Sequence, residues 1–306
     1  MIGEQSRRSP ITDYRSLITN ADMLATTPNT LAESPVLDGH SHAFPDEIAA
    51  RAIETLTHGA QWFPVKAWHD GSVRGLLERM DEAGIRRSLM CSIATRPGQV
   101  RKITDWSAKV KSGRVIPFAS IHPDFDEPEA EVERIASLGL PGLKFHPQYM
   151  NCPADDPRVI RIARAAAKAG LAMVFHAGFD LAFAKSDIAS PRRIRNLHEA
   201  VPELRLLACH LGGWECWEES LAEVVGRPIY LETSFCLGQC DMDTLRRIID
   251  KHSPDMLMFG SDSPWANPAA DLAIFKELPL SPQAMTKALW ENGNRFAGIA
   301  SGVGEF

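Results

Sequence analysis

Short apolar runs rich in branched side chains alternate along most of the chain with segments in which apolar residues recur every three or four positions. The first pattern predicts buried strands and the second predicts amphipathic helices. A strand–helix–strand alternation predicts a parallel sheet covered by helices. The predicted strands cover residues 36–42, 87–93, 114–121, 140–146, 171–176, 204–211, 228–234 and 256–262, and the predicted helices cover 73–83, 100–110, 128–138, 158–169, 192–200, 217–225, 244–251 and 282–296.

Eight such units predict an α/β fold of the (β/α)8 TIM-barrel type, with one barrel over residues 35–306. The connection between the first two strands is longer than the others, and a helical segment at 46–56 with an aromatic loop behind it predicts an inserted element. Residues 1–34 have no strong period. We predict that they form an N-terminal arm, packed across the barrel bottom or against a partner subunit.

The composition is that of an ordinary globular enzyme: 306 residues, 44% hydrophobic and 24% charged. The net charge of −6 argues against a nucleic-acid or anionic-membrane partner, because both select a basic surface. No apolar run is long enough to span a bilayer, and no apolar segment of a secretory signal follows Arg7 and Arg8. A cytoplasmic location is therefore expected. The six cysteines have no scaffold spacing and are expected to be free thiols.

The predicted strands end in polar residues, and in this fold the carboxyl ends of the strands carry the chemistry. His40 and His42 leave the first strand on one face, where two imidazoles can bind the same metal ion. A lone His-x-His pair is a weak signal, but similar residues recur at later strand ends, and packing alone does not account for so many at one rim. These residues are His122, Lys144, His146, His176, His210 and Asp262.

The motifs around these residues resemble the amidohydrolase superfamily. The branch they are most similar to is amidohydrolase-2, which includes aminocarboxymuconate semialdehyde decarboxylase. The resemblance runs from Val36 to about Ile299. Its motifs are Asp38-Gly39-His40-Ser41-His42, Gly142-Leu143-Lys144-Phe145-His146-Pro147, Val174-Phe175-His176-Ala177-Gly178, Cys209-His210-Leu211-Gly212-Gly213 and Phe259-Gly260-Ser261-Asp262-Ser263-Pro264-Trp265.

The resemblance implies one divalent metal ion. Its ligands would be His40, His42, His176 and Asp262, a set that suits zinc and also accepts manganese, iron or cobalt. Asp262 would additionally take a proton from a metal-bound water, and His210 would polarise the substrate or carry a proton.

Lys144 has three interpretations. It could be carbamylated and bridge a second metal, it could meet the substrate as a cation beside His146, or it could be a solvent-exposed lysine. The mononuclear interpretation is favoured because His146 follows on the same strand face. Trp265 and His122 are further candidates for substrate binding, although His122 is equally compatible with a structural role.

The predicted activity is hydrolysis of a small carboxylated or cyclic substrate. A non-oxidative decarboxylase or hydratase on the same site is the alternative, and a non-catalytic metal-binding protein is a remote one. Decarboxylases of the branch carry a cation on the loop after the first strand. Lys66, between two tryptophans, is the predicted candidate there, because Arg51 is expected to face solvent. A homo-oligomer, most simply a dimer, is expected.

Overall fold

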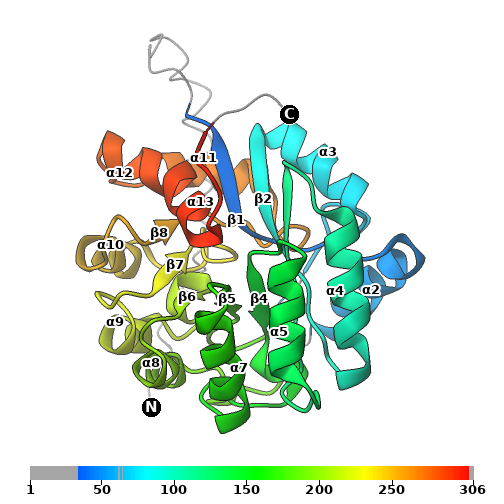
Figure 1. Cartoon of the computed structure of the whole chain (residues 1–306). Helices are drawn as coiled ribbons and strands as arrows, with labels where there is room; N and C mark the ends of the chain where they lie inside the picture. The colour runs from blue at the N-terminus through cyan, green and yellow to red at the C-terminus, as the bar shows by residue number, and fades with distance from the viewer. Residues whose placement is uncertain (1–33, 61–62, 64, 303–306) are drawn as a thin grey trace, which may run out of the picture.

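Eight parallel strands surrounded by helices make up the computed structural model, which describes residues 34–60, 63 and 65–302 (Figure 1). The predicted arm at 1–34 lies outside the described residues except for Ser34. The strands follow one another in chain order. They are β1 (Val36–Ser41), β2 (Ile85–Cys91), β3 (Val115–Phe118), β4 (Gly142–Phe145), β5 (Ala172–Phe175), β6 (Arg205–Ala208), β7 (Tyr230–Glu232) and β8 (Leu257–Met258).

The strands pair in two parallel groups, β1–β2–β3 and β4 to β8. Two isolated bridges join the groups: Ala119 with Leu143 between β3 and β4, and Ser41 with Ser263 between β1 and the segment after β8. The Gly39 amide adds a 2.8 Å hydrogen bond to the Phe259 carbonyl at the second seam. This arrangement confirms the predicted (β/α)8 class.

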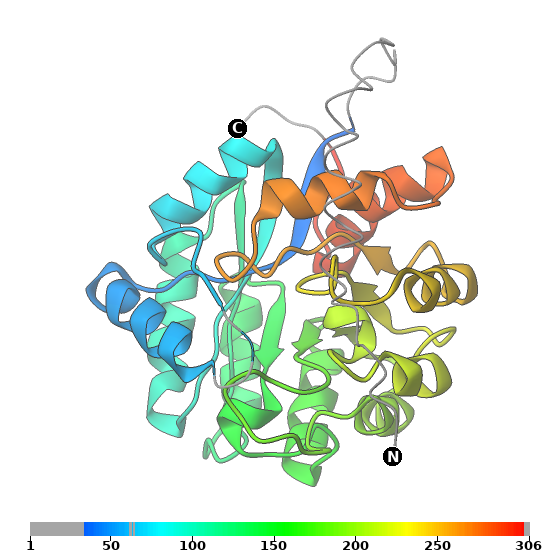
Figure 2. The ribbon, with the colours of Figure 1, turned by 180° about the vertical axis from the view of Figure 1, so that it is seen from behind.

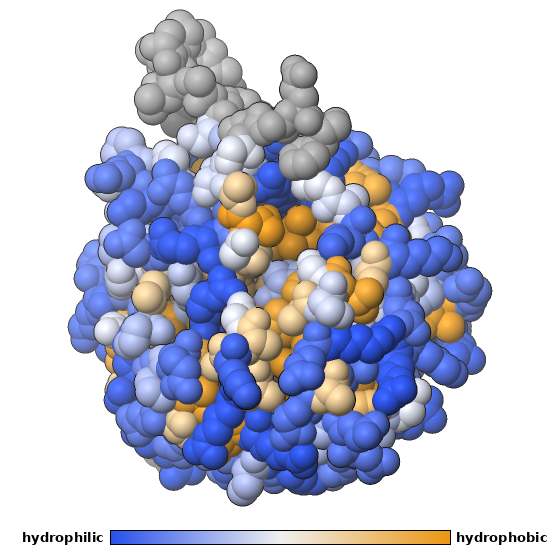
Figure 3. Space-filling model, viewed as in Figure 1, coloured by the Kyte–Doolittle hydropathy of each residue, from blue (hydrophilic) through white to orange (hydrophobic). Residues whose placement is uncertain are grey.

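Helices cover the outside of the strands (Figure 2). Several begin and end where the periodicity predicts, and α3 starts at a serine cap, since Ser72 Oγ accepts a 2.9 Å bond from the Gly75 amide. Hydrophilic residues cover most of the face seen in Figure 3, as expected for amphipathic helices. The helices are α2 (Asp46–Gly59), α3 (Val73–Ala83), α4 (Val100–Val110), α5 (Pro128–Ser137), α6 (Pro147–Met150), α7 (Pro157–Lys168), α8 (Pro191–Ala200), α9 (Trp217–Glu223), α10 (Met242–Lys251), α11 (Pro268–Lys276), α12 (Pro282–Thr286) and α13 (Asn292–Ala297).

The structure departs from the predicted elements in several places. Helices α6 and α11 were not predicted, and a π-helical turn over Lys287–Glu291 divides the predicted last helix. β3 ends at Phe118, before the predicted boundary. The inserted element after β1 is α2, a helix with only Ala49 fully buried.

The core has two layers. One lies inside the barrel and includes Leu37, Phe118 and Val174, and the other lies between the strands and the helices. All six cysteines are free thiols, as predicted. Within the described residues, no helix combines the length and hydropathy that a membrane crossing requires.

Candidate metal centre and substrate cavity

The ends of the strands open into a cavity of about 520 Å³. Eight of the nine predicted site residues line it, although they come from five different strands and the loops that follow them. This convergence confirms that the strand-end pattern marks one place in the molecule. The eight residues are His40, His42, Lys144, His146, His176, His210, Asp262 and Trp265.

Two histidines and a carboxylate form the centre of the site. Oδ1 of Asp262 lies 3.2 Å from Nε2 of His42 and 3.6 Å from Nε2 of His40. All three side chains are buried or nearly so. Although it is buried, the Asp262 carboxyl has a pKa below its usual range, so the group is a carboxylate.

The outer ring nitrogens of both histidines are fixed as donors. Nδ1 of His42 lies 2.8 Å from the Cys91 carbonyl, and Nδ1 of His40 lies 3.2 Å from Oε1 of Glu232 and 3.0 Å from Oγ of Ser234. A carbonyl and a carboxylate only accept hydrogen bonds, so each ring must carry its proton on Nδ1. Burial lowers the pKa of His40 well below its ordinary value, which keeps that ring neutral.

Lone pairs consequently face lone pairs at the centre of the site. With Nδ1 protonated, Nε2 of His42 points an acceptor at Asp262 Oδ1, itself a buried oxygen that accepts no hydrogen bond from any described residue. Two buried acceptors at this distance repel each other unless a cation lies between them. Two imidazole nitrogens and a carboxylate oxygen are the donor set of a divalent transition metal, so these residues fit the predicted ion.

His176 and His210 show the same arrangement. Nε2 of His176 donates to the Phe179 carbonyl over 2.9 Å, and Nδ1 of His210 donates to the Ser234 carbonyl over 2.9 Å. The two inner nitrogens, His176 Nδ1 and His210 Nε2, lie 3.0 Å apart. When each ring carries a single proton, on its outer nitrogen, this gap also holds two acceptors. His176 is not close enough to all three central groups to join their cluster, so its place as the fourth ligand stays a prediction.

Glu232, the last residue of β7, and Ser234, two residues later, hold the histidines in place. Oε1 of the fully buried Glu232 faces His40 Nδ1 and accepts a 3.0 Å bond from the His210 amide. The carboxylate of Asp38, on β1, accepts hydrogen bonds of 2.9 and 2.6 Å from the amide and the hydroxyl of Ser261, and these bonds join β1 to the segment after β8. Glu232 and Asp38 thus set the orientation of groups that face the cavity.

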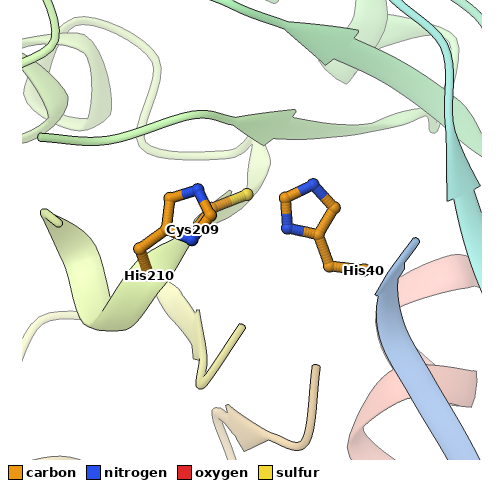
Figure 4. Close-up of side chains that lie close together, drawn as sticks. All are labelled: His40, Cys209 and His210. Atoms are coloured by element: carbon orange, nitrogen blue, oxygen red, sulfur yellow. The ribbon is translucent and has the colours of Figure 1, made fainter. Parts of the chain in front are cut away.

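Lys144 is buried, which excludes the solvent-exposed interpretation. Its ammonium donates to His40 Nε2 over 3.0 Å and to Cys209 Sγ over 3.2 Å. Figure 4 shows His40 reaching in from β1 toward Cys209 and His210, which follow β6. Lys144 thus places a positive charge directly beside the central cluster.

A second group of potential ligands lies on the other side of His176. His146 stacks on it with ring centroids 4.0 Å apart, and Nε2 of His146 lies 3.3 Å from Oδ2 of Asp180. Sequence reasoning missed Asp180, although its position in the loop just after the His176 motif could have indicated it. Burial lowers the pKa of His146 well below its usual value, so the ring is neutral.

His122 does not line the cavity. It lies in the loop after β3, where its Nδ1 accepts a 3.1 Å bond from the Asp124 amide. It closes a turn, and its predicted role in substrate binding is not supported.

Lys66 also does not lie where it was expected. Lys66 does not line the cavity and instead lies 4.6 Å above the Trp68 ring, whereas Arg51 does line it. Arg51 is exposed, as expected, and it also borders the cavity, because α2 runs along the cavity mouth with Ile48 and Leu56 in the wall. Trp265, after β8, lines the cavity as predicted, and Trp214, after β6, lines it too.

A (β/α)8 fold with histidines and an aspartate converging at the strand ends defines a class of metal-dependent barrel enzymes. The family model described as amidohydrolase matches residues 37–299. The chain therefore belongs to the amidohydrolase family and is an enzyme of that superfamily. No curated protein matches it.

Solved structures share the fold. A 5-carboxyvanillate decarboxylase from Sphingomonas paucimobilis is 17% identical, with a TM-score of 0.66 over 87% of this chain and 100% of that one. A dihydroxybenzoic acid decarboxylase from Polaromonas with bound manganese is 14% identical, with a TM-score of 0.64 over 87% and 97%. A probable 2-pyrone-4,6-dicarboxylic acid hydrolase from Acinetobacter baumannii is 15% identical, with a TM-score of 0.60 over 86% and 99%.

Proposed function

We propose that this protein is a metal-dependent, non-oxidative decarboxylase of a carboxylated aromatic or cyclic acid. The observation that carries the proposal is the face-to-face pair of buried acceptors, His42 Nε2 and Asp262 Oδ1, which fits a divalent cation. The proposal departs from the hydrolysis favoured by the sequence. We choose decarboxylation because two of the three solved structures described above are named as decarboxylases and because a cation, Arg51, is present after β1.

When bound, the metal ion would supply positive charge for the substrate oxygens near the carboxylate that leaves. Lys144, beside His40, adds a fixed positive charge at the same end of the cavity. Arg51 at the mouth is suited to a carboxylate, and Trp214, Phe235 and Trp265 provide apolar walls for a ring.

His210 is suited to deliver the proton that the reaction consumes. Its Nδ1–H is held by the Ser234 carbonyl, so Nε2 is the nitrogen that can take up and release a proton. As the carbon–carbon bond breaks and carbon dioxide leaves, the electron pair stays on the substrate carbon, which then takes the proton from Nε2. Glu232 and Ser234 hold the ring in place for this transfer.

The test is an assay of manganese- and zinc-reconstituted protein with carboxylated phenols and carboxylated lactones in heavy-oxygen water. Carbon dioxide release without heavy oxygen in the product would support decarboxylation. Ring opening with heavy oxygen in the product and no carbon dioxide would contradict it in favour of hydrolysis. Asp255→Asn is the matched control for Asp262→Asn, because Asp255 is a surface aspartate paired with Lys287.

A further inference from the structure

The cavity extends well beyond the central cluster, along the segment that follows β2. Ile93, Ile103 and Trp106 give this part an apolar wall, and Arg96 and Lys102 line it too. The same cavity is therefore lined by histidines at the strand ends and by two cations, Arg96 after β2 and Lys102 on α4, with apolar residues among them.

The two cations have no acidic partner among the described residues. Neither Arg96 nor Lys102 forms an ion pair, whereas their neighbour Arg101 on the outside of α4 lies 3.3 Å from Glu127. Most other arginines on this barrel are paired in the same way, for example Arg161 with Glu129 and Arg247 with Glu218. The positive charge of Arg96 and Lys102 is thus left available to a ligand.

The loop that carries Arg96 is held in shape. Oε1 of Gln99 accepts 3.0 Å hydrogen bonds from the Thr95 hydroxyl and from the Arg96 amide, which ties the start of the 3₁₀ turn Pro97–Gln99. Binding an anion there would require ordering of side chains but little movement of the backbone, which reduces the cost of binding.

The net charge of the cavity also favours an anionic ligand. Its lining contains four cations, Arg51, Arg96, Lys102 and Lys144, and two carboxylates, Asp180 and Asp262. Asp180 is adjacent to His146, and Asp262 belongs to the central cluster. The cavity is therefore positive in a chain whose net charge is −6, which favours entry of anions.

We propose that the substrate is an elongated acid with a second anionic group at its far end, and that Arg96 and Lys102 bind this group. The proposal rests on the proposed function only in that it places the reacting carboxylate at the histidine end. Ile93, Ile103 and Trp106 contact the apolar body between the two charges. A compact single-ring acid would leave the Arg96 and Lys102 end of the cavity empty.

The test uses octanedioate, decanedioate and dodecanedioate, each against its monomethyl ester, which has the same length and one charge fewer. Binding to metal-loaded protein is measured by calorimetry. The longer diacids should bind about 5- to 10-fold more tightly than their esters, the range expected for one or two partly exposed ion pairs. Arg96→Met and Lys102→Met should each reduce this preference, and Lys109→Met, on the same helix but away from the cavity, should not.

Equal binding of diacid and ester by the wild-type protein would overturn the proposal, and so would an unchanged preference in both Arg96→Met and Lys102→Met. The outcome is separate from that of the proposed function. If the protein releases no carbon dioxide from any acid but keeps a diacid preference that depends on Arg96 and Lys102, the decarboxylase proposal fails and the anion site stands.

Discussion

The two ends of the barrel each contain a cavity, and the larger one is at the end opposite the histidines. That cavity, where the strands begin, has a volume of about 760 Å³ and is lined by Arg87, Lys111 and Arg205. The cavity at the strand ends measures about 520 Å³. Both contain cations among apolar residues, so neither volume nor charge alone separates them.

The difference lies in what the polar groups contact. Arg205 donates to the Arg295 carbonyl over 3.1 Å and also to the Gly170 carbonyl, and Lys111 donates to the Leu138 carbonyl over 2.9 Å. These cations fasten loops together. At the other end, Asp262 Oδ1 and His42 Nε2 are two acceptors that face each other over 3.2 Å. Unsatisfied polar groups, rather than volume, mark the functional end.

The largest effect is expected from removing the central carboxylate. Asp262→Asn takes away the anion that faces His40 and His42, so the protein should lose its metal and at least about 10³-fold in kcat. Metal content by elemental analysis and turnover of the substrate found in the assay check this. Asp255→Asn should keep both. An Asp262→Asn protein with full metal content and full activity would remove the central cluster from the account.

His210→Ala should separate metal binding from chemistry. His210 is placed as the proton donor, so the variant should retain metal and lose about 10²-fold in kcat. If the variant loses its metal instead, His210 would be a metal ligand. His176, which lies 3.0 Å from it, would then be the candidate proton donor.

Sequence periodicity predicts most of this architecture because burial of apolar faces determines it. The ends of α3 and α4 fall at the predicted residues, and alternation along β1 correctly places His40 and His42 on one face. His122 shows the limit of this approach. It lies in the loop after β3, and the course of that loop depends on tertiary packing rather than on the apolar pattern before it. Asp180, Arg51 and Arg96 lie on loops or an exposed helix, where position depends on tertiary packing.

Substitution of an arginine at each end of the barrel should change a different quantity: KM at the strand ends and Tm at the strand starts. Arg51→Met should raise KM about 10-fold for a carboxylated substrate and leave Tm unchanged, because Arg51 is exposed and lines the substrate cavity. Arg205→Met should lower Tm by roughly 2–4 °C per kcal/mol lost, with kcat and KM unchanged. Thermal unfolding of the two variants gives Tm, and steady-state kinetics gives kcat and KM. A reversal of the two effects would invalidate the distinction between the cavities.

The smallest effect concerns pH and lies away from the substrate cavity. Burial lowers the pKa of His252, after α10, to about 4, and its Nδ1 accepts a 3.1 Å bond from the Gly226 amide. The unfolded chain binds this proton near pH 6.5, so stability is complete above that pH and falls as the pH drops toward 4. Tm of the metal-free protein should fall less between pH 7 and 4.5 in His252→Gln than in wild type. Equal falls would show that His252 is not responsible.

The position of the metal ion tests the central claim most directly. A crystal structure of protein reconstituted with zinc or manganese, with anomalous data collected at the metal edge, would locate it. We expect one peak per chain, at about 2.0–2.2 Å from His40 Nε2, His42 Nε2 and Asp262 Oδ1. Two peaks, a peak confined to the His146, His176 and Asp180 group, or no peak after reconstitution would contradict the account.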